Sequence, residues 1–360
     1  MSLYARPKPP RLLALLIIFV YLVFSCFLLE TTRFRAEKPR SAQMLEAARR
    51  TEACFLSLKE ARIAAGYPID RLDDPNETGM VGMEFTGITT SVGALEAKRS
   101  TTNPNCAAMI TDFLVRCGVS EGDAVACNFS SSFPCLNIAT LCALDVLGAD
   151  GIIMNSIGAS TYGANLPEFA YLDMEQVLLE KGLIRNHTRW FSLGGSRDAG
   201  IDMMEIDSAE AIAARAQARG LTRLQFESTE DNLSARESIF TAEADKTGRP
   251  LRAFVNIGGN LLAFGGGENL IDAPNGLVRA PFKNMEHTGL IPWALDHGIP
   301  VIHLLEMKSL LPANGLPFDP VPLPQAGEGD VYEELRYRKG LALCLASGAA
   351  LLCVFLLRHR

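Results

Sequence analysis

Two long apolar stretches, one near each end, constrain the fold of this 360-residue chain most strongly. Residues 12–29 and 340–357 contain no charged side chain. Each stretch approaches the roughly 18–20 residues that an α-helix needs to cross a bilayer. About 310 residues with the polarity of an aqueous domain lie between them. The sequence therefore predicts a soluble domain, residues 40–330, flanked by one transmembrane helix on each side.

The start of the chain resembles a signal sequence. Residues 1–11 form a basic n-region ahead of the first apolar stretch. That stretch is longer than a usual signal core and no A-x-A-like cleavage site follows it, so we predict a retained signal-anchor. Seven lysines and arginines flank the two spans on the domain side and five on the terminal sides, which favours a cytoplasmic domain. The signal-like start favours the opposite side, and the two indications nearly cancel, with a slight lean to an extracytoplasmic domain.

Composition and motifs narrow the classes of function. The net charge is −7 and no basic cluster is interleaved with aromatic residues, so we expect no nucleic-acid partner. No Cys-x-x-Cys pair occurs and the histidines lack metal-ligand spacing, so we expect no metal site. Neither a Walker phosphate loop nor a Gly-x-Gly-x-x-Gly fingerprint is complete, so we expect no nucleotide cofactor.

Short apolar runs alternate with helical patterns along the domain. Residues 41–65, 134–147 and 205–219 predict helices, and strands are expected at 123–129, 151–154, 252–257 and 298–305. This alternation predicts an α/β fold, with a mostly parallel sheet and helices on both faces, as one large domain or as two lobes. Ligands of such sheets bind beyond the carboxyl ends of the strands, near a topological switch point.

A serine triplet is the sharpest local feature at such a strand end. Ser130, Ser131 and Ser132 follow the predicted strand 123–129, and Pro134 stands where a first helical residue belongs. The free amides and positive dipole end of the helix would attract a phosphate or a carboxylate. Two other interpretations stay open: the serines cap a structural helix, or Ser131 or Ser132 is a nucleophile.

Two further turns are candidate ligand contacts. The loop at 155–165 contains Asn155, Ser160 and Asn165 among other polar residues, and loops this polar on a rigid strand often carry function. Gly258 and Gly259 follow the strand at 252–257 and would let a ligand approach the backbone closely. The alternative is that these turns only satisfy their own backbone.

Two basic residues, His303 and Lys98, complete the candidates. His303 is the only histidine inside a predicted strand, and it would act either as a general base for a serine or as a satisfied core residue. Lys98, beside Arg99, would face an anionic substrate such as a polycarboxylate, or it belongs to a solvated turn.

Several strings of residues, in the same order, resemble the bacterial poly-gamma-glutamate system protein family. They lie at 89–91, 95–105, 131–139, 158–165, 172–175, 255–259, 300–304 and 324–329. One departure occurs at Ser131, where the Ser-x-Ser-Phe-Pro string of the family is expected to have glycine. The C-terminal anchor is a second departure, since relatives need not share it.

The resemblance implies an accessory protein of poly-gamma-glutamate synthesis or export, held in the bacterial cytoplasmic membrane and working with the other subunits of that system. It carries over no catalytic residues. We therefore expect an anion-binding domain for the polymer or its gamma-glutamyl precursor. Two alternatives remain: a gamma-glutamyl hydrolase or transferase with a serine nucleophile, and a non-catalytic scaffold that recruits the synthase.

Overall fold

A computed structural model describes residues 12–358, which divide into two compact units. One unit is Arg40–Tyr332, and the other contains the two terminal segments, up to Pro39 and from Glu333 onward. The predicted n-region, residues 1–11, lies outside the described residues.

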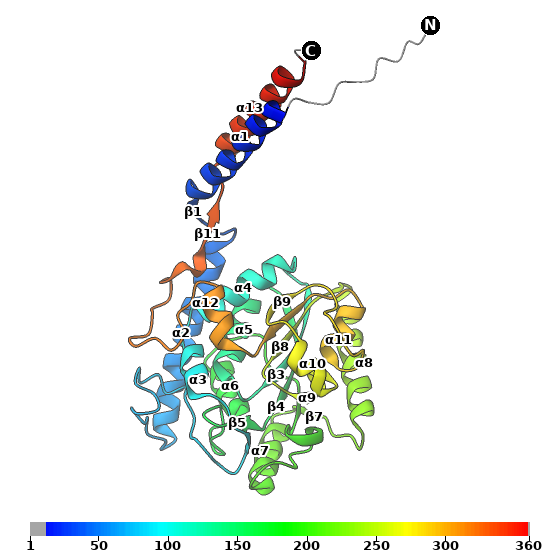
Figure 1. Ribbon diagram of the computed structural model, residues 1–360. Helices are drawn as coiled ribbons and strands as arrows, with labels where there is room; N and C mark the ends of the chain where they lie inside the picture. Colours follow the sequence, from blue (N-terminus) through cyan, green and yellow to red (C-terminus); the bar gives the residue numbers. More distant parts are fainter. Residues whose placement is uncertain (1–11, 359–360) are drawn as a thin grey trace. The chain divides into compact units, whose positions relative to one another are not determined.

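The terminal unit is a pair of apolar helices joined to a short β-ladder. Helix α1 (Leu12–Thr31) lies beside α13 (Lys339–Arg358), and strand β1 (Phe34–Glu37) pairs antiparallel with β11 (Glu333–Arg336) (Figure 1). The Tyr21 hydroxyl donates to the Leu345 carbonyl at 3.0 Å, and this bond ties the two helices together. Both helices are long and apolar enough to cross a membrane, by length and composition.

The Arg40–Tyr332 unit is built on one seven-stranded sheet with the order β7-β6-β4-β3-β8-β10-β9. Every neighbouring pair is parallel except the last, in which β9 runs antiparallel to β10. The strands are β3 (Ala124–Ser130), β4 (Asp150–Ser156), β6 (Trp190–Ser192), β7 (Thr222–Arg223), β8 (Leu251–Ile257), β9 (Gly276–Val278) and β10 (Val301–Leu304). A separate parallel pair joins β2 (Thr89–Ser91) to β5 (Ala159–Ser160). The predicted α/β class with a mostly parallel sheet is confirmed.

Helices cover both faces of this sheet (Figure 1). Successive side chains of a strand point to opposite faces, and those of β3 alternate between two separate apolar clusters. One cluster contains the helices α2 (Ser41–Ala64), α4 (Cys106–Arg116), α5 (Pro134–Leu147), α6 (Tyr171–Glu180) and α7 (Ile206–Ala218). The other contains α8 (Thr229–Thr247), α9 (Leu261–Phe264) and α11 (Leu290–Asp296). The shorter helices are α3 (Leu95–Thr101), α10 (Gly267–Asp272) and α12 (Met307–Ala313), and single 3-10 turns lie at η1 (Ser196–Asp198) and η2 (Asp330–Tyr332).

The strand order reverses direction between β3 and β8. From β3 the chain proceeds outward through β4, β6 and β7, then returns to β8 on the other side of β3 and continues to β10. The loops that leave β3 and β8 therefore diverge. In open α/β sheets such a divergence creates a crevice beyond the carboxyl ends of the strands.

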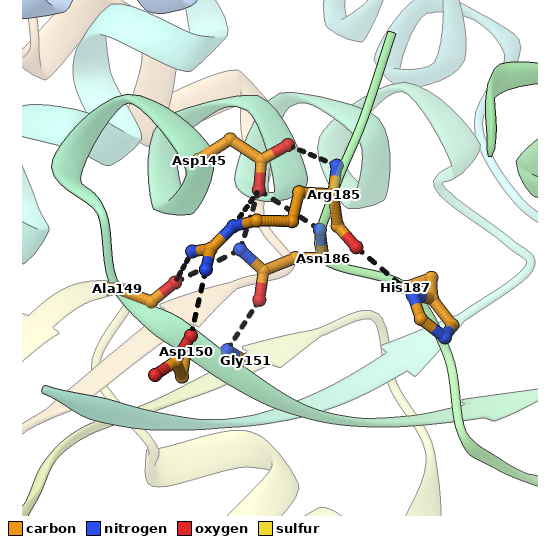
Figure 2. A network of polar contacts seen from close by, with 7 residues as sticks. All are labelled: Asp145, Ala149, Asp150, Gly151, Arg185, Asn186 and His187. Atoms are coloured by element: carbon orange, nitrogen blue, oxygen red, sulfur yellow. Dashed lines mark hydrogen bonds and ion pairs between the residues drawn. The ribbon is translucent and has the colours of Figure 1, made fainter. Parts of the chain in front are cut away.

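A polar clamp fixes the opposite, amino-terminal end of the sheet (Figure 2). The Asp145 carboxylate at the end of α5 accepts hydrogen bonds from the Arg185 amide at 2.7 Å and the Asn186 amide at 3.0 Å. The Asn186 side chain accepts from the Gly151 amide at 2.7 Å and donates to the Ala149 carbonyl at 3.0 Å. These bonds pin the segment leading into β6 against the start of β4, so the clamp organises the sheet far from its carboxyl edge.

Candidate functional site

A cleft of about 490 Å³ opens at the switch point. Residues from the loops after β2, β3, β4, β6, β8 and β10 line it. Among the sequence candidates, it is lined by Lys98, Ser130, Ser132, Ser160 and Gly259. The sheet topology thus gathers into one cleft five positions that lie far apart in the sequence.

The serine triplet divides between the cleft and the core. Ser130 and Ser132 line the cleft, and the Ser132 amide donates to the Ser130 hydroxyl at 3.2 Å. Ser131 is fully buried, and its hydroxyl donates to the Ser156 carbonyl at 2.6 Å. The Ser131 hydroxyl therefore joins the turn after β3 to the end of β4, while Ser130 and Ser132 line the cleft.

Lys98, on α3, is the basic side chain of the cleft. It is 4% exposed, and its amino group donates to the Ser160 hydroxyl at 2.7 Å and to the Ser132 carbonyl. The amine also lies 3.8 Å from the centre of the Phe133 ring, a cation–π distance. Burial lowers the pKa of Lys98 to about 7. Within residues 12–358 no carboxylate forms an ion pair with this amine.

Ser160 is held in place from three directions. It ends β5, which pairs with β2, and its amide donates to the Ser132 hydroxyl at 3.0 Å. The backbone of Gly93 also approaches it closely: a Cβ at that position would lie 2.8 Å from the Ser160 hydroxyl. A larger residue at Gly93 would therefore displace the hydroxyl that Lys98 contacts.

Asn155, Asn165 and Gly258 support the walls of the cleft and do not line it. The Asn155 side-chain oxygen accepts from the Ser131 hydroxyl at 3.3 Å. The Asn165 side chain accepts from the Met83 amide at 3.0 Å and donates to its carbonyl at 2.7 Å, which fastens the 82–89 loop. Gly258 has a φ of +88°, and a Cβ there would lie 2.9 Å from the Ser130 side chain, so glycine is needed at this turn.

His303 lies beneath the cleft in a polar row that crosses the sheet. In the strand register, His303 of β10 pairs with Asn256 of β8, and Asn256 pairs with Asn128 of β3. The Asn128 amide group donates to the Asn256 side-chain oxygen at 2.8 Å, and the Asn256 amide group meets His303 Nδ1 at 3.1 Å. Because that amide group is a donor, His303 Nδ1 accepts, which requires a neutral ring. Burial lowers the pKa of His303 to about 4, in agreement with a neutral ring.

The predicted pairing of His303 with a serine of the triplet therefore has no counterpart in the described residues. The hydrogen bond of its Nδ1 goes to Asn256, and its ring packs edge-on against Phe264. His303 is also not a residue of the cleft wall. Its surroundings are those of a buried core histidine.

A buried ion pair continues the polar row on the other side. Arg236 of α8 and Asp198 are each 1% exposed in their side chains and lie 2.7 Å apart. Arg236 also donates to Asn128 at 3.3 Å and to Ser192 at 3.1 Å. This network was not predicted from the sequence. The signal that could have indicated it is the pair Asn128 and Asn256, two polar residues inside otherwise apolar strands.

Two carboxylates stand at the cleft wall. Asp202 accepts from the amide and the hydroxyl of Ser196 at 2.7 and 2.6 Å, and Glu306 caps α12 by accepting from the Lys308 amide at 3.2 Å. One buried amine and two carboxylates do not form a broad positive surface. The charges of the cleft wall therefore do not favour a long run of negative charges.

Comparisons with protein-family models, with curated proteins and with solved structures found no match to this chain.

Proposed function

We propose that this protein is a membrane-anchored accessory of a poly-gamma-glutamate synthesis or export system, and that the cleft binds one gamma-glutamyl unit of the polymer or its precursor. The observation that carries the proposal is Lys98, a buried amine in a cleft at the switch point with no carboxylate partner within residues 12–358. The family resemblance of the surrounding strings supplies the identity of the ligand.

The environment of Lys98 favours an anionic ligand. Two of its three N–H donors meet neutral oxygens, so the protonated amine keeps its charge uncompensated at a large desolvation cost. A carboxylate in the cleft would supply the missing charge. Ser130 and Ser132, at the start of the 14-residue helix α5, add hydroxyl groups and a positive helix end beside it.

The net charge of −7 favours recognition of an anionic ligand by a few groups inside the cleft. A negatively charged protein repels a polyanion at long range, so attraction must come from a few groups at short range. Asp202 and Glu306 at the cleft wall provide acceptors for the amino group of a gamma-glutamyl end unit. The end of a chain, which carries both an amine and a carboxylate, therefore fits the cleft better than the interior of the polymer.

The terminal helices α1 and α13 support membrane attachment. Both are long and apolar enough to span a bilayer, and they lie side by side in opposite directions. If both insert, the two chain ends lie on one side of the membrane and the Arg40–Tyr332 domain on the other.

A binding titration with the full-length protein in detergent micelles tests this function. Gamma-glutamyl oligomers of two to five units are titrated at pH 6.5 into the wild type, Lys98→Met and Lys283→Met, the last being an exposed lysine away from the cleft. We expect saturable binding by the wild type and by Lys283→Met. Loss of a charge-assisted hydrogen bond should weaken binding by Lys98→Met about 10- to 150-fold.

Absence of binding by the wild type, or equal affinity of the wild type and Lys98→Met, would contradict the proposal. The scaffold alternative predicts the first result. It also predicts that polymer output in a producing cell depends on the two anchors and is indifferent to Lys98.

A further inference from the structure

We propose that Ser160 is the nucleophile of a hydrolytic acyl transfer in this cleft, that Lys98 is its general base, and that the bond broken is a gamma-glutamyl amide. The inference rests on the proposed function, because it takes the ligand of the cleft as its substrate. It assigns the chemistry to a serine outside the triplet and to a base other than His303.

The geometry meets the first requirement for such a pair. The Ser160 hydroxyl oxygen and the Lys98 nitrogen lie 2.7 Å apart, and both residues line the cleft. A protonated amine donates in this contact. A neutral amine uses its lone pair to accept the serine proton at the same distance, as in enzymes that pair serine with lysine.

The surroundings of Lys98 make the neutral form accessible. The side chain is almost fully buried, with no carboxylate within residues 12–358 to hold its proton. Burial lowers its pKa to about 7, so the neutral amine becomes accessible near neutral pH. A general base works best when its pKa lies near the working pH.

Ser132 completes the arrangement as a hydrogen-bond donor. Its hydroxyl oxygen accepts from the Ser160 amide at 3.0 Å, so it lies next to the nucleophile. That bond leaves the hydroxyl proton of Ser132 unused. It is positioned to donate to the carbonyl oxygen of a substrate as negative charge develops there.

The other serines of the triplet lack these features. Ser131 is fully buried and its hydroxyl is bonded to the Ser156 carbonyl. Ser130 accepts from the Ser132 amide, and no base contacts it within residues 12–358. Ser160 therefore combines a place in the cleft wall with the Lys98 amine at hydrogen-bond distance, which neither Ser130 nor Ser131 does.

The reaction proceeds in two balanced halves. The Ser160 oxygen attacks the amide carbon while its proton moves to Lys98; the carbon–nitrogen bond then breaks, and Lys98 returns the proton to the departing amine. This leaves the acyl group as an ester on Ser160. Water attacks that ester, gives a proton to Lys98, and releases a carboxylic acid, and the proton of Lys98 returns to Ser160.

The experiment uses the full-length protein in detergent micelles, with poly-gamma-glutamate as substrate and a fluorophosphonate as covalent probe. Chain length and new amino groups are followed with time, and the labelled serine is located by peptide mass spectrometry. The variants are Ser160→Ala, Ser160→Cys and Lys98→Met, and the control is Ser309→Ala, an exposed serine outside the cleft.

We expect the wild type and Ser309→Ala to shorten the polymer and to be labelled at Ser160. Ser160→Ala should lose both signals, by at least about 1,000-fold in rate, and should still bind the oligomers saturably. In Ser160→Cys, iodoacetamide should modify the thiol at position 160 faster than in Ser160→Cys combined with Lys98→Met. This last comparison remains informative if Ser160→Ala misfolds.

The kcat/KM of the wild type should rise with pH through about 7, because the free protein must hold a neutral Lys98. The kcat should rise only at higher pH, because a ligand carboxylate beside Lys98 favours the charged amine, and the complex must lose that proton before Ser160 can react. Binding of the wild type without cleavage or labelling would overturn the acyl-transfer inference alone. Cleavage that survives in Ser160→Ala would also overturn it. Failure of the wild type to bind the oligomers would overturn the proposed function itself.

Discussion

Replacing Lys98 with methionine should reveal how much the buried amine costs the domain. Methionine has nearly the length of the lysine stem and no charge, so the variant isolates the effect of protonation in a site that is 4% exposed. We expect the free energy of unfolding of the wild type to rise, relative to that of Lys98→Met, as the pH increases from 6 to 9.

The sign follows from the depressed pKa. An unfolded chain binds a proton at Lys98 up to a pKa near 10.4, whereas the folded protein releases it at about 7. Between these values the unfolded state holds more protons, so stability increases with pH. The penalty is fully present below pH 7 and disappears above about pH 10.

The magnitude follows from the same two values. A depression of the pKa to about 7 corresponds to a full penalty of about 5 kcal/mol at low pH. From pH 6 to pH 9, the wild type should gain about 2–3 kcal/mol relative to the variant. Most of this gain should appear above pH 7.

Urea denaturation followed by tryptophan fluorescence measures this difference. The chain has two tryptophans, and both Trp190 and Trp293 belong to the Arg40–Tyr332 unit, so the signal reports that unit alone. Lys283→Met serves as control, and it should show the same pH dependence as the wild type. If the difference in free energy of unfolding between the wild type and Lys98→Met stays constant from pH 6 to 9, the claim that burial lowers the pKa of Lys98 is refuted.

Four further predictions follow from the contacts. Asp198→Asn should lower the free energy of unfolding by about 3–5 kcal/mol in urea titrations, because it leaves buried Arg236 without its partner; a loss below about 1 kcal/mol would contradict this. Gly258→Ala should cost at least about 1 kcal/mol, owing to its positive φ and the contact with Ser130; an unchanged stability would be inconsistent with that geometry. Ser131→Ala should cost about 1–3 kcal/mol while leaving oligomer affinity within threefold, since its hydroxyl faces the core; a large loss of affinity would place it in the cleft after all. The affinity of the wild type for the oligomers should fall by up to about tenfold per pH unit above pH 7, because Lys98 loses its proton. An affinity that does not change with pH would show that Lys98 does not contribute to binding.

Much of the sheet could be predicted from the sequence because its strands are buried on both faces. The apolar run at 123–129 matches β3 to within one residue, the run at 252–257 lies within β8, and the run at 298–305 contains β10. The helices expected at 41–65 and 134–147 were found within one residue of their bounds. Strands of a parallel sheet are buried on both faces, so continuous apolar runs bounded by glycine and serine predict their positions well.

The longest helix that the sequence did not reveal is α8, Thr229–Thr247. Its inward face buries Asn232 and Arg236 beside Phe240 and Ala244. The polar pair breaks the apolar spacing that marks an amphipathic helix, although Ser228 caps its start by accepting from the Asp231 amide at 3.0 Å. Hydrophobic periodicity therefore does not reveal a helix whose buried face contains charged and polar residues.

The location of the candidate site could be predicted from the sequence, but the contacts between its residues could not. The sequence indicated the strand ends, and the topology brought Ser130, Ser132, Ser160 and Lys98 to one cleft. The contact between Lys98 and Ser160 joins positions 62 residues apart and depends on how α3 packs against the loop after β4. Local patterns cannot specify such a long-range contact, and they also could not show that Ser131 and its two neighbours face opposite ways.

Net proton uptake on ligand binding tests the central claim most directly. Calorimetric titration of a gamma-glutamyl oligomer at pH 8, in two buffers of different ionisation enthalpy, counts the protons bound with each ligand. Because free Lys98 is mostly neutral at pH 8 and a bound carboxylate favours its charged form, the wild type should take up close to one proton per ligand and Lys98→Met none. Equal proton uptake by the two proteins would contradict the claim that the ligand meets Lys98 in the cleft.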